Sequence, residues 1–286
     1  MHFQTFSVVV GTKACNAHCP FCISKQTGLP TPTEVNWRNF RIACKTFKSQ
    51  NEATTVLLTG KGEPTLYPEL ITRHLVELAP FQFPFIELQT NGIEIASGKL
   101  DEYLESWYRQ GMTTIALSVV HFDDRKNAQI YQPDKTSYTN LEVLIHKLHS
   151  IGFSVRLCVM LLKGYIDTAN GVEAVIWYCK HLGVEQLTFR NIKAADVTSD
   201  NGVTEWTRQH ALDDAEMGTI NAYVKTNGTR LLPLADGAVV YDVGGQNVCL
   251  GTCLTLTPSQ DGLRQLIFFP SGELRWDWQY SGARIL

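Results

Sequence analysis

The sequence alternates short apolar, β-branched segments with longer amphipathic segments over its first two thirds. The predicted strands cover residues 5–11, 54–58, 85–89, 113–119, 154–161 and 186–190. The first intervening helix opens near Thr33 and Glu34, and the others cover residues 68–78, 100–110, 138–150 and 169–181. Repeated strand and helix alternation requires parallel strands joined by right-handed crossovers. We therefore predict an α/β fold, a partial (β/α)6 TIM-like barrel whose active site is built by the loops after the strands.

The last ninety or so residues have a different character. A helix is predicted over residues 205–224, and the short strands after it are separated by turn dipeptides. These dipeptides are Asn227-Gly228, Gly244-Gly245, Asp261-Gly262 and Ser271-Gly272. We therefore divide the chain into a barrel domain of residues 1–195 and a strand-rich C-terminal extension of residues 196–286 that caps it.

Composition excludes several classes of protein. The chain has 286 residues, 44% of them hydrophobic and 19% charged, which is ordinary for a globular domain. Its apolar runs are too short to cross a bilayer, and no signal peptide is visible, so we expect a cytoplasmic protein without a membrane partner. A formal net charge of −3 argues against broad electrostatic binding of nucleic acid.

Three of the eight cysteines, Cys15, Cys19 and Cys22, lie within eight residues directly after the first predicted strand. Eight cysteines are too few for a disulfide scaffold in a chain of this length, so metal or redox chemistry is favoured. Three thiolates supply one ligand fewer than a closed zinc or four-cysteine cluster site needs, which leaves one metal position for another ligand. The alternative is a structural zinc site completed by His18 or by a distant cysteine.

This spacing, with the aromatic residue Phe21 directly before Cys22, resembles the signature of the radical S-adenosylmethionine (SAM) superfamily. The resemblance extends over about residues 5–190. It implies that the three cysteines bind three irons of a [4Fe–4S] cluster, while the amino and carboxylate groups of SAM chelate the fourth. It also implies that the backbone of Phe21 lies near the adenine.

A second segment, from Thr59 to Pro64, reads Thr-Gly-Lys-Gly-Glu-Pro and resembles the Gly-Gly-Glu-Pro segment that contacts the SAM amino group in this family. Lys61 departs from the commonest form. Glycine allows a close approach of the backbone to a ligand, and a carboxylate or nearby carbonyl accepts hydrogen bonds from an ammonium. The SAM site is therefore expected to include Gly60, Gly62, Glu63 and Pro64.

The resemblance places further SAM contacts on the later strands, at Thr90, Asn91, Ser118 and Arg156. Arg190, at the end of the sixth predicted strand, is a candidate contact for SAM or for an anionic substrate. Each has a simpler alternative, because a Thr-Asn-Gly sequence is usually a turn and an arginine within a strand often forms a structural ion pair. Cys158 also stands where many members of the family have asparagine. The ends of parallel strands would bring these positions into one pocket although they are far apart in the sequence.

The resemblance implies an enzyme in which flavodoxin or ferredoxin reduces the cluster. The cluster then cleaves SAM reductively to methionine and a 5′-deoxyadenosyl radical, which abstracts a hydrogen atom from the substrate. The acidic balance and the absence of an obvious peptide-binding or RNA-binding module favour a small-molecule or nucleotide substrate. Modification of a peptide or protein is the alternative within the enzyme class, and a zinc-binding interaction module is the alternative outside it.

Other polar and sulfur-containing residues are weaker candidates. Charged and aromatic residues after the fourth and fifth strands are candidates for substrate contact, namely His121, Asp123, Arg125, Lys126, Lys163 and Tyr165. Cys249 and Cys253 form a second close pair, but an auxiliary cluster needs three or four cysteine ligands. We therefore predict a single cluster, with Cys249 and Cys253 structural or close to the substrate.

Overall fold

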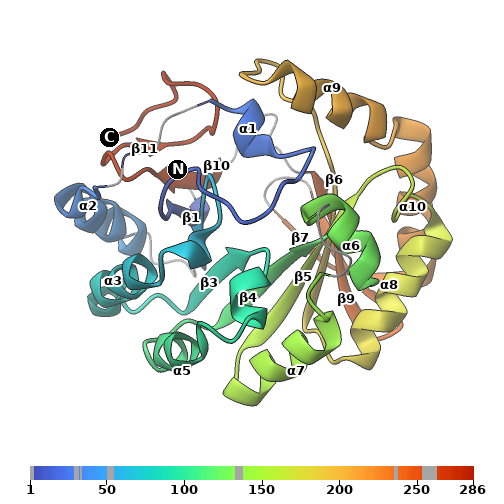
Figure 1. Cartoon of the computed structure of the whole chain (residues 1–286), viewed down its shortest axis with the longest axis horizontal. Coiled ribbons are helices and arrows are strands. Elements are labelled where there is room, and N and C mark those ends of the chain that lie inside the picture. The colour runs from blue at the N-terminus through green and yellow to red at the C-terminus, as the bar shows by residue number, and fades with distance from the viewer. Residues whose placement is uncertain are drawn as a thin grey trace.

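Six parallel strands in chain order form the central part of the sheet (Figure 1). The computed structural model describes residues 3–28, 32, 34–49, 55–132, 138–234, 238–252 and 263–286. The strands are β1 (Phe3–Val9), β2 (Thr55–Thr59), β3 (Phe85–Thr90), β4 (Thr114–Val119), β5 (Ser154–Leu161) and β6 (Gln186–Asn191). Each pairs in parallel with the next, so the predicted α/β alternation is confirmed. The predictions at Thr33, Thr54, Cys253 and Asp261-Gly262 lie outside the described residues.

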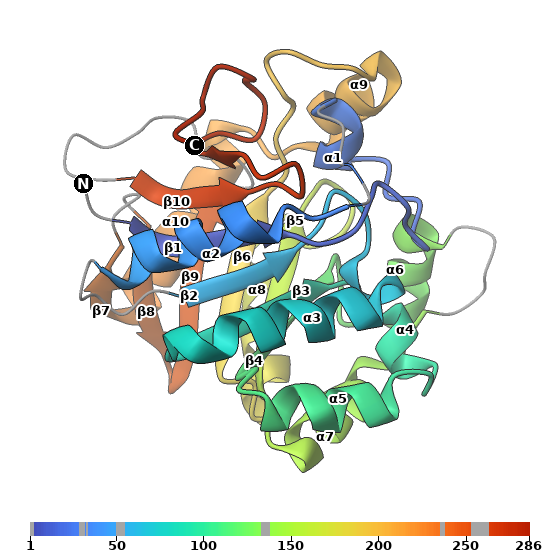
Figure 2. The same ribbon diagram turned by 90° about the vertical axis from the view of Figure 1, so that its left-hand side faces the viewer.

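The long helices cover the outer face of these strands (Figures 1 and 2). They are α2 (Trp37–Lys48), α3 (Pro68–Leu78), α5 (Asp101–Arg109), α7 (Leu141–Ile151) and α8 (Ala169–His181). Alternate strand residues such as Phe6 and Leu58 are fully buried against the helices, where they meet helix residues such as Phe40. The strand period of two and the helix period of 3.6 therefore place one apolar layer between sheet and helices. These helices leave the opposite face of the strands and the carboxyl ends of the strands for the site.

Several short elements in the loops were not predicted. They are α1 (Ile23–Gln26), α4 (Ile93–Ala96), α6 (Asp124–Tyr131) and the 3₁₀ turns η1 (Pro64–Leu66) and η2 (Ala79–Phe81). A four-residue helix completes only about one turn, so its sequence carries no amphipathic repeat. Two of these elements, α1 and η1, begin directly after the cysteine and glycine motifs and shape the site.

The C-terminal strands join the central sheet at both of its edges. They are β7 (Gly228–Pro233), β8 (Val239–Val243), β9 (Gln246–Thr252), β10 (Leu263–Phe268) and β11 (Leu274–Arg275). β9 runs parallel to β6 and β10 runs parallel to β1, which gives the order β11-β10-β1-β2-β3-β4-β5-β6-β9-β8-β7. The sheet therefore continues across the predicted boundary after residue 195, and the C-terminal strands widen it at both edges of the central six strands.

The helix predicted over residues 205–224 is two helices, α9 (Asn201–His210) and α10 (Asp214–Asn227). The single helix is wrong because Asp213 forms a capping box with Glu216 and starts a new helix. Helix α9 lies beside α1 at the end of the sheet where the cysteine loop emerges (Figure 2). Among the described residues, no helix combines the length and the apolar character that crossing a bilayer requires.

Candidate active site

A pocket of about 590 Å³ opens at the carboxyl ends of β1 to β6. This volume is typical of small-molecule and cofactor sites. Twelve of the thirteen residues predicted from the sequence as metal or cofactor contacts line it. They are Cys15, Cys19, Phe21, Cys22, Gly60, Gly62, Glu63, Pro64, Thr90, Asn91, Ser118 and Arg190. The strand ends therefore bring together side chains that are up to 175 positions apart in the sequence, from Cys15 to Arg190.

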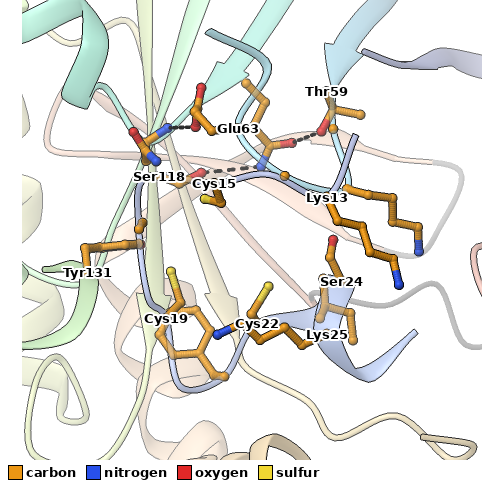
Figure 3. Close-up of a pocket in the computed structure, with 18 of the residues that line it drawn as sticks. Lys13, Cys15, Cys19, Cys22, Ser24, Lys25, Thr59, Glu63, Ser118 and Tyr131 are labelled. Atoms are coloured by element: carbon orange, nitrogen blue, oxygen red, sulfur yellow. Dashed lines mark hydrogen bonds between the residues drawn. The ribbon is translucent and has the colours of Figure 1, made fainter. Parts of the chain in front are cut away.

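The cysteine loop runs from the end of β1 to α1, and its three sulfur atoms border one space (Figure 3). All three thiols are free, and burial raises the pKa of the Cys15 and Cys19 thiols. Thiolates that are partly withdrawn from water need positive partners, which irons supply. Within the described ranges, no three His, Cys, Asp or Glu side chains lie close enough together to bind one metal ion. A four-iron cluster offers each thiolate its own iron, so this donor set fits such a cluster.

The loop is held against the neighbouring strand ends by polar contacts. The side-chain amide of Asn91 donates to Oδ1 of Asn16 at 2.8 Å, and Asn16 donates in turn to Glu94 at 3.1 Å. The backbone N–H of Glu63 donates to the carbonyl of Ala14 at 2.9 Å. A Cβ at Gly62 would lie 2.0 Å from that carbonyl oxygen. Glycine is therefore required at position 62 for the cysteine loop and the loop after β2 to meet.

Glu63 is 4% exposed, and its carboxylate joins the loops after β2 and β3. Oε1 accepts hydrogen bonds from Oγ1 of Thr65 and from Oγ1 of Thr90, each at 2.7 Å, and from the Thr65 N–H at 3.0 Å. Oε2 accepts the N–H of Asn91 at 2.9 Å. Burial raises the pKa of Glu63, and these four donors oppose that rise. Glu63 therefore holds the two loops together, and whether its carboxylate or a nearby carbonyl accepts from the SAM ammonium stays a prediction.

Ser118 and Arg190 lie at the pocket as expected, but Arg156 does not. Arg156 forms an ion pair with Glu87 of β3. In the register between β4 and β5, Arg156 is opposite Ala116, whereas Cys158 is opposite Ser118. Arg156 is thus two residues before the level of the pocket residue Ser118. A strand rises by about 3.3 Å per residue, so Arg156 lies deeper in the sheet than the pocket. Arg156 therefore has the structural ion pair that was the alternative to a SAM contact, and its contact with SAM stays a prediction.

Other pocket residues were not predicted from the sequence. Gln89 links two walls, since it accepts from Thr59 at 3.5 Å and donates to Ser118 at 3.4 Å (Figure 3). The others include Lys13, Ser24, Lys25, Tyr131, Met160, Ile192, Lys193, Ser199 and Asp200. Lys13 and Lys25 flank the cysteine motif, which is a usable signal. The remaining residues come from elements whose approach to the motif depends on the tertiary fold.

The fully buried Gln26 explains how residues 192–207 reach the site. Its side-chain amide donates to the Phe21 carbonyl at 3.3 Å and to Oγ1 of Thr207 at 3.2 Å, and its oxygen accepts the Ala195 N–H at 2.8 Å. The cysteine loop is thereby attached to the segment after β6 and to α9. The fold thus places Phe21 against Trp206 of α9, with ring centroids 6.2 Å apart.

The candidate substrate contacts after β4 and β5 are not part of the described pocket wall. Asp123 caps α6, and its N–H donates to Nδ1 of His121 at 2.9 Å. Lys163 pairs with Glu216 of α10 at 3.4 Å. These three residues therefore have structural partners, and their role in substrate binding stays a prediction, as it does for Arg125, Lys126 and Tyr165.

The sequence that forms this site matches the model of a known protein family. The family model described as the Radical SAM superfamily matches residues 9–176, more than half of the chain. The chain belongs to the radical SAM superfamily. The matched range contains the cysteine motif, the segment after β2 and Ser118. As a radical SAM enzyme, the protein uses SAM together with a [4Fe–4S] cluster.

Solved structures with similar folds include radical SAM enzymes. Native anSMEcpe with bound AdoMet (SAM) is 12% identical with a TM-score of 0.62, over 98% of this chain and 76% of that chain. SuiB from Streptococcus suis, bound to its precursor peptide SuiA, is 14% identical with a TM-score of 0.59, over 95% and 59%. HydG, a maturase of the [FeFe]-hydrogenase, is 11% identical with a TM-score of 0.57, over 78% and 49%. A search of curated protein sequences found no match. At these identities the likeness concerns the fold.

Proposed function

We propose that this radical SAM enzyme removes a hydrogen atom from a small substrate that carries a carboxylate or phosphate group, such as a nucleotide. The observation that carries this proposal is the charge of the pocket wall. Five basic residues line it, namely Lys13, Lys25, Lys61, Arg190 and Lys193. The acidic residues of the wall are Glu63, whose oxygens are already hydrogen-bonded, and Asp200. The whole chain carries a net charge of −3, so this positive charge is local to the pocket.

The residues at the pocket have separate roles in this proposal. Cys15, Cys19 and Cys22 hold the cluster, which supplies the electron for SAM cleavage when it is bound. Backbone groups of residues 60–64 and the polar side chains of Thr90, Asn91 and Ser118 bind SAM, and Arg190 takes its carboxylate. The backbone of Phe21 contacts the adenine.

The apolar part of the wall protects the reaction. Phe21, Met160 and Ile192 line the pocket beside the cysteines. Apolar walls exclude water and keep a reactive intermediate from side reactions. In the same proposal, flavodoxin or ferredoxin supplies the electron, and the enzyme works in the cytoplasm.

Peptide modification is the second candidate. It is supported by the peptides in structures of similar fold, since SuiB is bound to SuiA and one anSMEcpe structure of TM-score 0.50 holds the Cp18Cys peptide. In that case the basic residues of the pocket wall would bind acidic side chains or the carboxyl terminus of the peptide. The two candidates differ in the size of the molecule that donates the hydrogen atom.

Deuterium transfer distinguishes them. Anaerobically reconstituted enzyme is incubated with SAM, dithionite and a deuterium-labelled cell extract separated by filtration into small molecules and peptides. The small molecules are then divided by anion exchange. The proposal predicts deuterium in 5′-deoxyadenosine with the anionic small-molecule fraction. Transfer only from the peptide fraction would establish the second candidate, and transfer only from uncharged molecules would refute the proposal.

A further inference from the structure

Lys61 places a buried amine in the pocket wall. It occupies a position of the glycine-rich segment where the commonest form of this segment has glycine, and it is 3% exposed. Nζ donates to the carbonyl of Thr27 at 3.2 Å and to its Oγ1 at 2.8 Å, and it lies 5.4 Å from the centre of the Trp278 ring. Thr27 and Trp278 are uncharged, so these contacts do not neutralise the ammonium.

The neighbourhood of Lys61 adds positive charge. Burial lowers the pKa of Lys61 to about 8. The nearby charges of Lys13 and Arg275 also lower this pKa, and Cys22 and Asp277 raise it by less. Arg275 is 6% exposed and pairs with Glu273, yet its Nε and Nη1 are buried without a hydrogen-bond partner. A buried cation is costly unless an anion or a set of acceptors compensates it. The region around Lys61, Lys13 and Arg275 is therefore suited to bind an anion.

A second nearby carboxylate, that of Asp277, already has backbone hydrogen-bond partners. Oδ1 of Asp277 accepts the N–H groups of Gln279 at 2.7 Å and Tyr280 at 3.1 Å, so it organises the turn after β11. That turn positions Trp278, whose ring also packs on Phe269 with centroids 5.9 Å apart. The C-terminal segment thus brings an aromatic face to Lys61, and such a face favours a cation.

We propose that Lys61, together with Lys13 and beside Trp278, forms a subsite for the anionic group of the substrate. This inference rests on the proposed function and names the residues that recognise the anion. Lys13 and Lys61 reach the pocket from the loops after β1 and β2, while Arg190 reaches it from β6, four strands beyond β2. In Figure 3 Lys13 lies on the side of Thr59 and Lys25, opposite Tyr131. The pocket thus has two separate basic sides, one for the SAM carboxylate and one for the substrate.

The test is a calorimetric titration of the reconstituted, SAM-bound enzyme with inorganic phosphate and, separately, with acetate at constant ionic strength. We expect saturable binding of one of these anions to wild type, and the preferred anion identifies a phosphate or a carboxylate substrate. Lys61→Met should weaken that binding at least about tenfold, because a charged hydrogen-bond donor is lost, while Lys61→Arg should retain most of it.

A matched control is available in Lys180→Met. Lys180 also donates to a backbone carbonyl, that of Gly244 at 2.6 Å, and its Nζ lies 5.9 Å from the centre of the Trp177 ring. It is not part of the pocket wall, so anion affinity should not change. If Lys61→Met fails to fold, Lys61→Gly, which restores the commonest form of the segment, and the exposed Lys13→Met give the same comparison.

The outcomes separate this inference from the proposed function. Wild type that cleaves SAM but binds neither anion, or variants at Lys61 and Lys13 that bind as wild type does, would overturn the subsite. Wild type that binds phosphate or acetate through Lys61 without any cleavage of SAM would support the subsite and refute the proposed function alone.

Discussion

The backbone N–H of Asn91 donates to the carboxylate of Glu63 at 2.9 Å, which fastens the loop after β3 to the loop after β2. Both loops line the pocket, and Asn91 also holds Asn16 of the cysteine loop. One buried carboxylate therefore aligns the cluster loop with two of the segments that we assign to SAM. Its role is to position these backbones.

Glu63→Gln tests that role. An amide replaces one acceptor oxygen with a donor, so at least one of the four donors around Glu63 loses its partner. We expect the free energy of unfolding to fall by roughly 2–4 kcal/mol, because the lost contacts are buried and involve a charge. SAM affinity should also fall. Thermal unfolding and equilibrium SAM binding measure the two effects.

Glu105→Gln is the control for this change, because Glu105 is an exposed residue paired with Arg109 on α5. Exposed ion pairs contribute little to stability. Equal unfolding temperatures for Glu63→Gln and Glu105→Gln would show that the Glu63 contacts do not organise the site.

Gly62→Ala should prevent cluster binding. The added Cβ would lie 2.0 Å from the Ala14 carbonyl oxygen, so the cysteine loop must move away from β2. Iron content and absorbance near 400 nm after anaerobic reconstitution should fall well below those of wild type. Gly218→Ala, in the interior of α10 with nothing within 4 Å of its added Cβ, should reconstitute fully. Full reconstitution of Gly62→Ala would contradict the close approach of the two loops.

His74 predicts a pH dependence of stability. Burial lowers its pKa to about 4, Nδ1 donates to the Leu70 carbonyl at 2.8 Å, and Nε2 is buried without a partner. Between pH 6.5 and 4 the unfolded chain binds a proton that the folded chain does not, so stability decreases as pH falls through this window. The loss from this one group should approach roughly 3 kcal/mol.

The measurement is the urea midpoint of wild type and of His74→Phe at several pH values from 7 to 4. Contributions from other groups cancel in the difference between the two proteins. The variant should lose less stability than wild type on acidification. Parallel pH profiles would contradict the lowered pKa, because they mean that His74 binds its proton at the same pH in the folded and the unfolded chain.

We predict one cluster per chain, which iron analysis checks. Cys249 lies on β9, opposite Thr188 of β6, and is not part of the described pocket wall. Cys44 and Cys179 are fully buried on helices. About four irons per chain should therefore bind on full reconstitution, as a single [4Fe–4S] cluster requires. About eight irons, falling to about four in a Cys249→Ala, Cys253→Ala variant, would establish an auxiliary cluster.

The sequence predicts most of the central fold and of the site because both depend on local signals. Period-two and period-3.6 patterns mark the strands and helices, and the cysteine spacing and the Gly60 to Pro64 segment identify two walls of the pocket. The contacts of Gln26 and Lys61 could not be predicted in this way. Nothing local to Gln26 indicates that it contacts Thr207, and nothing local to Lys61 indicates that its amine reaches Trp278.

The surroundings of Arg156 also could not be predicted from its local sequence. Its place on β5 made it a candidate for SAM, but the depth of a side chain along a strand depends on register. Its ion-pair partner, Glu87, lies two strands away on β3. The positions of β9 beside β6 and of β10 beside β1 likewise depend on pairing between segments far apart in the chain.

Formation of 5′-deoxyadenosine tests the central claim most directly. Reconstituted enzyme is incubated anaerobically with SAM and dithionite, and the product is quantified for wild type, for single Ala variants of Cys15, Cys19 and Cys22, and for Cys179→Ala as a control. The account predicts SAM cleavage by wild type and the control and its loss in each of the other three variants. No cleavage by wild type, or near-wild-type cleavage by any one of the three, would contradict it.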